Sequence, residues 1–194
     1  MNQIFEELRD HIERRVARLA VIGLGYVGLP MAIEFANAGY PVVGIDNDPG
    51  RVAKLKEGKS YILDISEHQI RDCGEKLTAT SSYSALREAE VVVICVPTPL
   101  RKTKDPDLSY ILSATSEIAK YLHKGQLVIL ESTTYPGTTE EIILPELQAA
   151  GLKVGNDFFV AFSPERIDPG NPKYTIHNTP KIVGGVTEDR KSVV

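Results

Sequence analysis

A glycine-rich turn between an apolar strand and a helix constrains this chain more than any other feature. Residues 21–30 read VIGLGYVGLP, in which Gly23, Gly25 and Gly28 have the spacing G-x-G-x-x-G. They lie where a buried strand, predicted over 18–24 from its apolar run, passes into a helix predicted over 27–38. In such a turn the first glycine permits the tight bend, the second lets the main chain approach a pyrophosphate, and the third lets the helix pack on the strand. The pattern therefore predicts an α/β fold with an anion site at the start of a helix.

The rest of the chain continues this alternation of strands and helices. Apolar runs predict further strands at residues 41–46, 77–80, 91–96, 127–131, 158–162 and 181–186. Helical patterns separate most of them, near 51–56, from 66 onward, and over 83–89, 109–123 and 138–150. Because strands joined through helices form right-handed βαβ units, we expect a doubly wound parallel sheet of the Rossmann type, a single α/β domain with helices on both faces.

An amphipathic pattern precedes the first strand. Ile4, Phe5, Leu8, Ile12 and Val16 repeat at helical spacing among charged residues. They predict an N-terminal amphipathic helix in residues 1–17 that packs on a domain formed by residues 18–194. A helix lying on a membrane surface is the alternative, which the mixed charges disfavour. The chain stops soon after its last predicted strand, so it reads as one domain cut from a longer protein.

Composition excludes several classes of protein. With 194 residues, 42% hydrophobic and 25% charged, the chain is ordinary for one globular domain. Its 22 basic and 26 acidic residues give a net charge of −4, which argues against a nucleic-acid partner. No apolar run is long enough to cross a bilayer, and acidic residues interrupt any secretory signal near the N-terminus. Two cysteines and unclustered histidines predict no metal site and suit the reducing cytoplasm.

An acidic residue ends the second predicted strand. Asp46 lies 18 residues after Gly28, where a carboxylate accepts hydrogen bonds from a ribose diol and repels a 2′-phosphate. We therefore expect NAD rather than NADP, with Arg51 close enough to contact the adenosine. The alternative is that the glycines only shape a turn and that Asp46 caps the next helix.

Polar residues also follow the later strands. Thr98 comes after the fourth strand, Ser132, Thr133 and Thr134 after the fifth, and Glu165 after the sixth. Because the carboxyl ends of parallel strands meet at one edge of a sheet, these groups and the glycine turn predict a single cleft. Cys95, in the apolar run VVVICV, is interpreted as a core residue rather than a reactive thiol.

Five strings, in order along the chain, carry a resemblance to a known family: GLGYVGLP, ICVPTPL, ESTTYPGTTEE, FSPERIDPGN and PKIVGG. Together they resemble the UDP-sugar 6-dehydrogenases. The segments RKTKDPDLSY and SPERIDPGN are most similar to the members that act on UDP-N-acetylglucosamine. Members that act on UDP-N-acetylmannosamine or UDP-glucose stay open as alternatives.

The resemblance implies an activity and an architecture. The family oxidises the C6 hydroxyl of a UDP-hexose to a carboxylate with two NAD⁺, through a cysteine thioester that water hydrolyses, and it supplies precursors for polysaccharide synthesis. Its chains have an N-terminal NAD domain, a linking helix used in homodimerisation, and a C-terminal domain that binds the UDP-sugar. The nucleophilic cysteine belongs to a glycine-rich motif of the later half, which this chain lacks.

The resemblance also assigns residues. The pyrophosphate would lie on Gly23, Leu24, Gly25, Tyr26, Val27 and Gly28, and the adenosine ribose on Asp46 and Arg51. The rest of the cofactor would contact Val96, Pro97, Thr98, Ser132, Thr133 and Thr134. Thr133 matches the threonine that positions a catalytic water, and Glu165 matches the general acid/base of thioester hydrolysis. The sugar would face Glu165, Arg166, Ile167 and Asp168. The chain departs from some relatives at Pro169, where they carry a second acidic residue.

Two functional interpretations follow. In the first, this chain is the cofactor domain of a dehydrogenase, able to bind NAD but unable to complete the oxidation without the missing cysteine. In the second, it is a stand-alone NAD-binding module without chemistry. A hydroxyacid dehydrogenase of similar N-terminal architecture is a third, disfavoured by ESTTYPGTTEE and SPERIDPGN.

Overall fold

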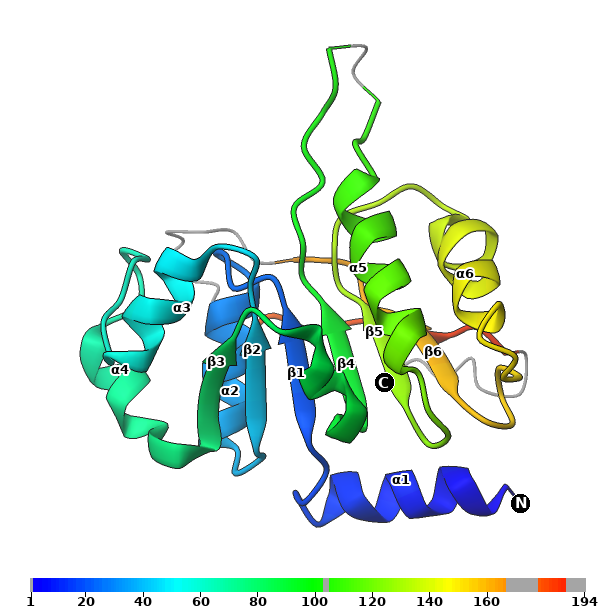
Figure 1. The fold of residues 1–194 in the computed structure, drawn as a ribbon, viewed down its shortest axis with the longest axis horizontal. Coiled ribbons are helices and arrows are strands. Elements are labelled where there is room, and N and C mark those ends of the chain that lie inside the picture. The colour runs from blue at the N-terminus through cyan, green and yellow to red at the C-terminus, as the bar shows by residue number, and fades with distance from the viewer. Residues whose placement is uncertain (1, 103–104, 167–177, 188–194) are drawn as a thin grey trace.

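A central sheet organises the chain (Figure 1). The computed structural model describes residues 2–102, 105–166 and 178–187. Within them, seven strands lie in the order β3-β2-β1-β4-β5-β6-β7, and all neighbours pair in parallel except β6 and β7. The strands are β1 (Leu19–Ile22), β2 (Val42–Ile45), β3 (Leu77–Thr80), β4 (Val91–Ile94), β5 (Leu127–Leu130), β6 (Phe159–Phe162) and β7 (Gly184–Gly185). The expected doubly wound sheet is confirmed, and its strand order reverses between β1 and β4.

Helices cover both faces of the sheet. One apolar cluster unites the sheet with α2 (Gly28–Asn37), α3 (Pro49–Lys56) and α4 (Glu67–Asp72). The other unites it with α5 (Ser109–Tyr121), α6 (Leu144–Gln148) and the 3₁₀ turn Tyr83–Glu88. A second 3₁₀ turn, Gly74–Lys76, leads into β3. None of the described helices has the length and apolar character that crossing a membrane requires.

The side chains of β4 show why the sequence of a central strand is apolar at every position. Val91 and Val93 belong to the cluster on the α2 face, whereas Val92 and Ile94 belong to the cluster on the α5 face. All four are buried. Successive side chains of a strand point to opposite faces, so a strand covered on both sides needs an apolar residue at every position.

The last strand differs from the expectation. A strand over 181–186 was expected, but β7 has only two residues and runs antiparallel to β6. A parallel neighbour requires a crossover of about a dozen or more residues, usually a helix. The sequence between β6 and β7 is rich in proline, asparagine and glycine, a composition that disfavours such a helix.

The helix expected over 138–150 is divided into two pieces. Residues Thr139–Ile143 form a π-helical turn, and α6 follows it. Pro145 lies in the first turn of α6, where it has no N–H to donate to the preceding turn. The loss of that hydrogen bond accounts for the change of helix type at this point.

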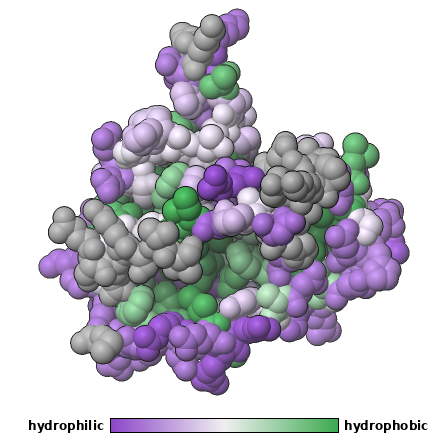
Figure 2. All heavy atoms as spheres, turned by 180° about the vertical axis from the view of Figure 1, so that it is seen from behind, coloured by the Kyte–Doolittle hydropathy of each residue, from purple (hydrophilic) through white to green (hydrophobic). Residues whose placement is uncertain are grey.

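The N-terminal helix α1 (Gln3–Glu13) packs beneath the sheet, along the lower edge in Figure 1. Leu8 is buried in the core, and the rings of Phe5 and Phe159 meet edge to face with centroids 5.5 Å apart. Asn2 caps the helix by accepting from the Ile4 N–H and donating to the Asn156 carbonyl. Seen from behind, the lower edge is hydrophilic, as expected for an amphipathic helix with its polar face outward (Figure 2).

One ion pair ties the end of α1 to the loop before β4. His11 Nδ1 lies 2.5 Å from Glu90 Oε1, and this hydrogen bond, followed by the charge of Glu90, raises the pKa of His11 above 6.5. A raised pKa means that the pair stabilises the fold fully below about pH 6.5 and loses that contribution as pH rises through the folded-state value. We therefore expect the docking of α1 to depend on pH.

We predict that His11→Gln lowers the free energy of unfolding at pH 6 and has a smaller effect at pH 9. Urea unfolding of both proteins at the two pH values measures this difference. Glu90→Gln provides the control, because in its background His11→Gln should cause no pH-dependent loss. An equal loss at both pH values would show that His11 acts through packing alone.

Candidate functional site

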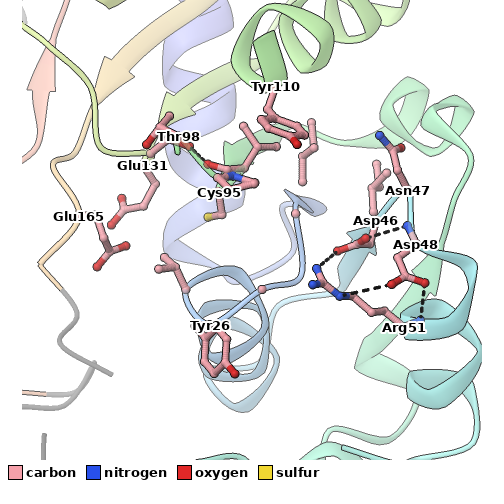
Figure 3. Close-up of a pocket in the computed structure, with 18 of the residues that line it drawn as sticks. Tyr26, Asp46, Asn47, Asp48, Arg51, Cys95, Thr98, Tyr110, Glu131 and Glu165 are labelled. Atoms are coloured by element: carbon pink, nitrogen blue, oxygen red, sulfur yellow. Dashed lines mark hydrogen bonds and ion pairs between the residues drawn. The ribbon is translucent and has the colours of Figure 1, made fainter. Parts of the chain in front are cut away.

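A cleft opens at the carboxyl ends of the parallel strands (Figure 3). It has a volume of about 690 Å³ and lies across the point where the strand order reverses, which is where open α/β sheets bind ligands. The structure brings most of the predicted site residues together on its wall: Gly23, Gly25, Tyr26, Val27, Asp46, Arg51, Val96, Pro97, Thr98, Ser132, Thr133 and Glu165.

A few predicted residues lie elsewhere. The Leu24 side chain is fully buried against Gly44, so only its main chain belongs to the glycine loop. Gly28 lies behind the loop, and Thr134 bonds to the Tyr135 carbonyl away from the cleft wall. Arg166 is exposed beyond the cleft, and the predicted sugar contacts Ile167 and Asp168 lie outside the described residues.

Each of the three glycines of the motif is glycine for a different structural reason. Gly23 has a φ of +89°, and a Cβ atom there would lie 2.8 Å from the Cys95 carbonyl oxygen. A Cβ atom on Gly28 would lie 1.8 Å from the Gly23 carbonyl oxygen, so the start of α2 can pack on the loop only without a side chain. At Gly25, by contrast, a Cβ atom would meet no protein atom within 4 Å. Nothing in the described chain explains the glycine at this position except the open cleft itself.

Asp46 holds the glycine loop in place. It directly follows β2 and has only 7% of its surface exposed. Its Oδ2 accepts from the Leu24 N–H at 2.8 Å, and its Oδ1 accepts from the Asp48 N–H at 2.9 Å. The alternative that Asp46 caps the next helix is wrong, because Asp48 caps α3 by accepting from the Gly50 and Arg51 N–H groups. Asp46 therefore joins β2 to the loop and still lines the cleft.

Arg51 completes this end of the cleft. Its guanidinium lies 3.3 Å from Asp46 Oδ2 and 3.7 Å from Asp48 Oδ2, and it stacks 5.7 Å from the centre of the Tyr61 ring. The Tyr61 hydroxyl donates to the Leu24 carbonyl at 2.7 Å. Burial and the nearby charge of Asp46 raise the pKa of Tyr61, so it remains a donor. Leu24 is thus held through both its N–H and its carbonyl.

The serine and threonine hydroxyl groups at the β4 and β5 end of the cleft have unequal roles. Ser132 is buried and donates to the Val96 carbonyl at 2.7 Å, which ties the end of β5 to the end of β4. Thr98 and Thr133 line the cleft without such burial. Ser132 therefore shapes the wall, and the two threonines present their side chains nearer to the open space.

The structure adds residues to the cleft that sequence reasoning missed: Ile22, Ile45, Asn47, Asp48, Tyr83, Cys95, Tyr110 and Glu131. Glu131 could have been found, because it follows β5 as Asp46 follows β2. It is buried and forms an ion pair with the Lys181 ammonium. Tyr83 begins the 3₁₀ turn and Tyr110 lies in the first turn of α5, and neither carries a sequence signal of its own.

Neither cysteine is suited to nucleophilic chemistry. Burial, assisted by the charge of Glu165, raises the pKa of the Cys95 thiol to about 12. Burial also raises the pKa of Cys73. Because the thiolate is the nucleophile, the raised pKa values disfavour reaction at either thiol near neutral pH. This agrees with the interpretation of Cys95 as a core residue. Among the residues that the structure describes, no cluster of side chains could hold a metal ion.

The cleft has the features that a dinucleotide requires. The open space over Gly25 admits a pyrophosphate close to the main chain. The N-terminus of α2 faces the same loop, and the side chain of its N-cap residue, Val27, forms no capping hydrogen bond. The Leu29 N–H donates to the Gly25 carbonyl, so the helix start contributes mainly through its partial positive charge. Asp46, at the end of the neighbouring strand, lies where a ribose diol would be bound.

Comparison with known sequences identifies relatives. Residues 17–194 match the model of the UDP-glucose/GDP-mannose dehydrogenase family, NAD binding domain. A UDP-N-acetyl-D-glucosamine 6-dehydrogenase of Pseudomonas aeruginosa is 40% identical over 178 residues, which are 91% of this chain and 42% of the relative. A UDP-N-acetyl-D-mannosamine dehydrogenase of Pyrococcus horikoshii is 43% identical over 88% of this chain and 41% of its own length. The chain thus spans less than half the length of these relatives.

Solved structures agree with this assignment. An NDP-N-acetyl-D-galactosaminuronic acid dehydrogenase from Methanosarcina mazei superposes with a TM-score of 0.86 and 32% identity, covering 97% of this chain and 42% of the other. A GDP-mannose dehydrogenase from Pseudomonas aeruginosa superposes with a TM-score of 0.83 and 28% identity. The match covers 89% of this chain and 42% of that enzyme. With the sheet, the glycine loop and these similarities in agreement, the chain belongs to the UDP-glucose/GDP-mannose dehydrogenase family, as its NAD-binding domain.

Proposed function

We propose that NAD lies along the cleft with its adenosine at the β2 end, its pyrophosphate over Gly25 and its nicotinamide at the β5 end. The observation that carries this proposal is the open space over Gly25, for which packing within the chain provides no reason. The reversal of strand order between β1 and β4 supports this position of the cofactor, because dinucleotides bind across a sheet where its strand order reverses.

Each end of the cleft then has a role. Residues 23–28 contact the pyrophosphate, and Asp46 and Arg51 contact the adenosine ribose. Val96, Pro97, Thr98 and Ser132–Thr134 surround the nicotinamide half. Among these, Ser132 acts through its hydrogen bond to the Val96 carbonyl, which shapes the wall, whereas the Thr134 side chain bonds to the Tyr135 carbonyl away from it.

For the whole protein we propose oxidation of the C6 hydroxyl of UDP-N-acetylglucosamine to a carboxylate, with two NAD⁺ per sugar. The 40% identity to the Pseudomonas aeruginosa enzyme supports this substrate. UDP-N-acetylmannosamine is the second candidate, favoured by the 43% identity to the Pyrococcus horikoshii enzyme. When bound, NAD⁺ supplies the hydride acceptor. The chain's own residues orient the substrate and move its protons: Thr133 would position a water, and Glu165 would act as general acid/base beside the sugar contacts 166–168.

The remaining proposals concern the domains, the oligomeric state and the cellular location of the protein. Residues 18–194 form the cofactor domain, and the N-terminal segment 1–17 docks on it through α1, which is shorter than expected because it spans only Gln3–Glu13. We propose that a further domain supplies the nucleophilic cysteine and binds most of the UDP-sugar, and that the whole protein is a homodimer in the cytoplasm. The buried reduced cysteines suit such a reducing compartment.

Calorimetry of this chain against NAD⁺, NADP⁺ and UDP-N-acetylglucosamine tests the proposal. NAD⁺ should bind, NADP⁺ should bind much more weakly, and the UDP-sugar should bind poorly without the further domain. Failure of NAD⁺ to bind to the folded chain would overturn the proposed function.

Gly25→Val should abolish NAD⁺ binding without unfolding the domain, because the new side chain would occupy the space of the pyrophosphate. Calorimetry measures binding, and circular dichroism measures the fold. Gly184→Val is the matched control, since a Cβ atom there also meets no protein atom within 4 Å but lies on β7 outside the cleft. Normal NAD⁺ affinity in Gly25→Val would place the pyrophosphate elsewhere.

Asp46→Ala should weaken NAD⁺ binding and reduce the preference for NAD⁺ over NADP⁺ by about tenfold or more, because a unit charge near the 2′-phosphate is worth roughly 1–4 kcal/mol. The change would also free Arg51 to contact that phosphate. Loosening of the glycine loop would weaken both cofactors alike, so the ratio of their dissociation constants isolates the charge. An unchanged ratio would remove Asp46 from cofactor selection.

In the whole protein, Glu165→Gln should slow release of the carboxylate product more than the first hydride transfer. A well-placed acid/base contributes about 10² to 10⁴ in rate. Single-turnover measurements of NADH formation and product release separate the two steps. Equal slowing of both would contradict the assignment of Glu165 to hydrolysis.

A further inference from the structure

The β2 end of the cleft contains an arginine whose presence a preference for NAD does not explain. Among the described residues that line the cleft, Arg51 is the only basic one. It lies beside Asp46, the carboxylate proposed to bind the ribose diol. In sheets of this kind that bind NADP, a nearby arginine accommodates the 2′-phosphate. A freely moving guanidinium at this position would therefore weaken the selection that Asp46 makes.

The Arg51 guanidinium is held between two carboxylates (Figure 3). Its Nη1 lies 3.3 Å from Asp46 Oδ2, and its Nε lies 3.7 Å from Asp48 Oδ2. All three side chains line the cleft. The positive charge of Arg51 is thus already matched by carboxylates of the chain before a ligand arrives.

Asp48 is fixed in place by its own hydrogen bonds. Its N–H donates to Asp46 Oδ1 at 2.9 Å, and its Oδ1 accepts from the Gly50 N–H at 2.8 Å and the Arg51 N–H at 3.3 Å. Because Oδ1 caps α3, Oδ2 is left to face the Arg51 side chain. An asparagine caps a helix about as well as an aspartate, so capping alone does not explain the charge at this position.

Tyr61 restrains the same guanidinium from the loop between α3 and α4. The Arg51 Cζ atom lies 5.7 Å from the centre of the Tyr61 ring, within the range of a cation–π contact. The Tyr61 hydroxyl donates to the Leu24 carbonyl at 2.7 Å, and the nearby side chains of Ile62 and Ile65 are buried in the core. The ring is therefore anchored at both ends before it meets Arg51.

We propose that Asp48 and Tyr61 are positioning residues that hold Arg51 against Asp46 and thereby deny its charge to a 2′-phosphate. The domain then selects NAD through two carboxylates and a restrained arginine rather than through Asp46 alone. This inference rests on the proposed function, because it requires the adenosine to lie at the β2 end. It assigns to Asp48 an effect on cofactor selection that a helix cap would not have.

The test compares dissociation constants of NAD⁺ and NADP⁺ measured by calorimetry, and selectivity is the ratio of the NADP⁺ constant to the NAD⁺ constant. Asp48→Asn keeps an oxygen that caps α3 but removes the charge that holds Arg51. It should lower selectivity by up to about fivefold, the range expected for a half-exposed ion pair. Asp64→Asn makes the same chemical change at an exposed position outside the cleft and should leave selectivity unchanged.

A double-variant comparison shows whether Asp48 acts through Arg51 or by its own charge. In the Arg51→Gln background the guanidinium is absent, so Asp48→Asn should cause little further change in selectivity. An equal effect of Asp48→Asn with and without Arg51 would show that Asp48 repels the phosphate directly. That result would overturn its role as a positioning residue.

Two substitutions of Tyr61 separate its hydroxyl from its ring. Tyr61→Phe keeps the ring but loses the hydrogen bond to Leu24, so it should weaken both cofactors alike and leave their ratio unchanged. Tyr61→Leu also removes the contact with Arg51 and should lower selectivity by about two- to fivefold. Equal ratios in the two variants would remove Tyr61 from the inference.

The outcomes distinguish this inference from the proposed function. If NAD⁺ binds but Asp48→Asn and Tyr61→Leu leave selectivity unchanged, the inference fails and the cofactor site stands. If NAD⁺ does not bind to the folded unaltered chain, the proposed function fails and the inference fails with it. A loss of selectivity in Asp48→Asn that depends on Arg51, in a variant whose circular dichroism shows an intact fold, supports the inference.

Discussion

The hydrogen bond from the Leu24 N–H to the Asp46 carboxylate joins the two strands that define this site. It fixes the glycine loop against the end of β2, while Tyr61 holds the carbonyl of the same residue from the other side. Because the loop is held by neighbouring elements, it needs no ligand to keep its shape. A preformed loop reduces the ordering cost of binding a pyrophosphate. The same carboxylate lines the cleft, so one side chain both positions the loop and presents charge to a ligand.

The charges in the cleft are arranged at its two ends. Asp46, Asp48 and Arg51 line the β2 end, and Glu131 and Glu165 line the β5 and β6 end, where Lys181 pairs with Glu131 from outside the lining. Each end combines two carboxylates with one cation. Between them lie the glycine loop and the start of α2, where main-chain amides attract anions. The charged side chains that line the described cleft therefore lie at its two ends, on either side of a loop that favours an anion.

Much of this arrangement could be predicted from local sequence. The strand, three glycines and helix predicted the loop, and the strand-end rule predicted Asp46, Thr98, Thr133 and Glu165 on one edge. The same rule applied to Glu131 would have found it as well. Lys181 could not be found this way, because it is distant in sequence and is brought to Glu131 only by the antiparallel pairing of β7 with β6. Tyr61 likewise reaches the loop from 37 residues away.

The sequence by itself determined the fold class, because apolar runs and helical periodicity depend only on neighbouring residues and recur along the whole chain. It also determined the family, since five motifs in order are specific together. Only the tertiary structure decided how the motif residues divide their roles: Gly23 and Gly28 serve packing, Gly25 faces open space, and Ser132, on the cleft wall, ties the end of β5 to the end of β4. These distinctions depend on atoms from strands far apart in sequence, whose approach no local pattern records.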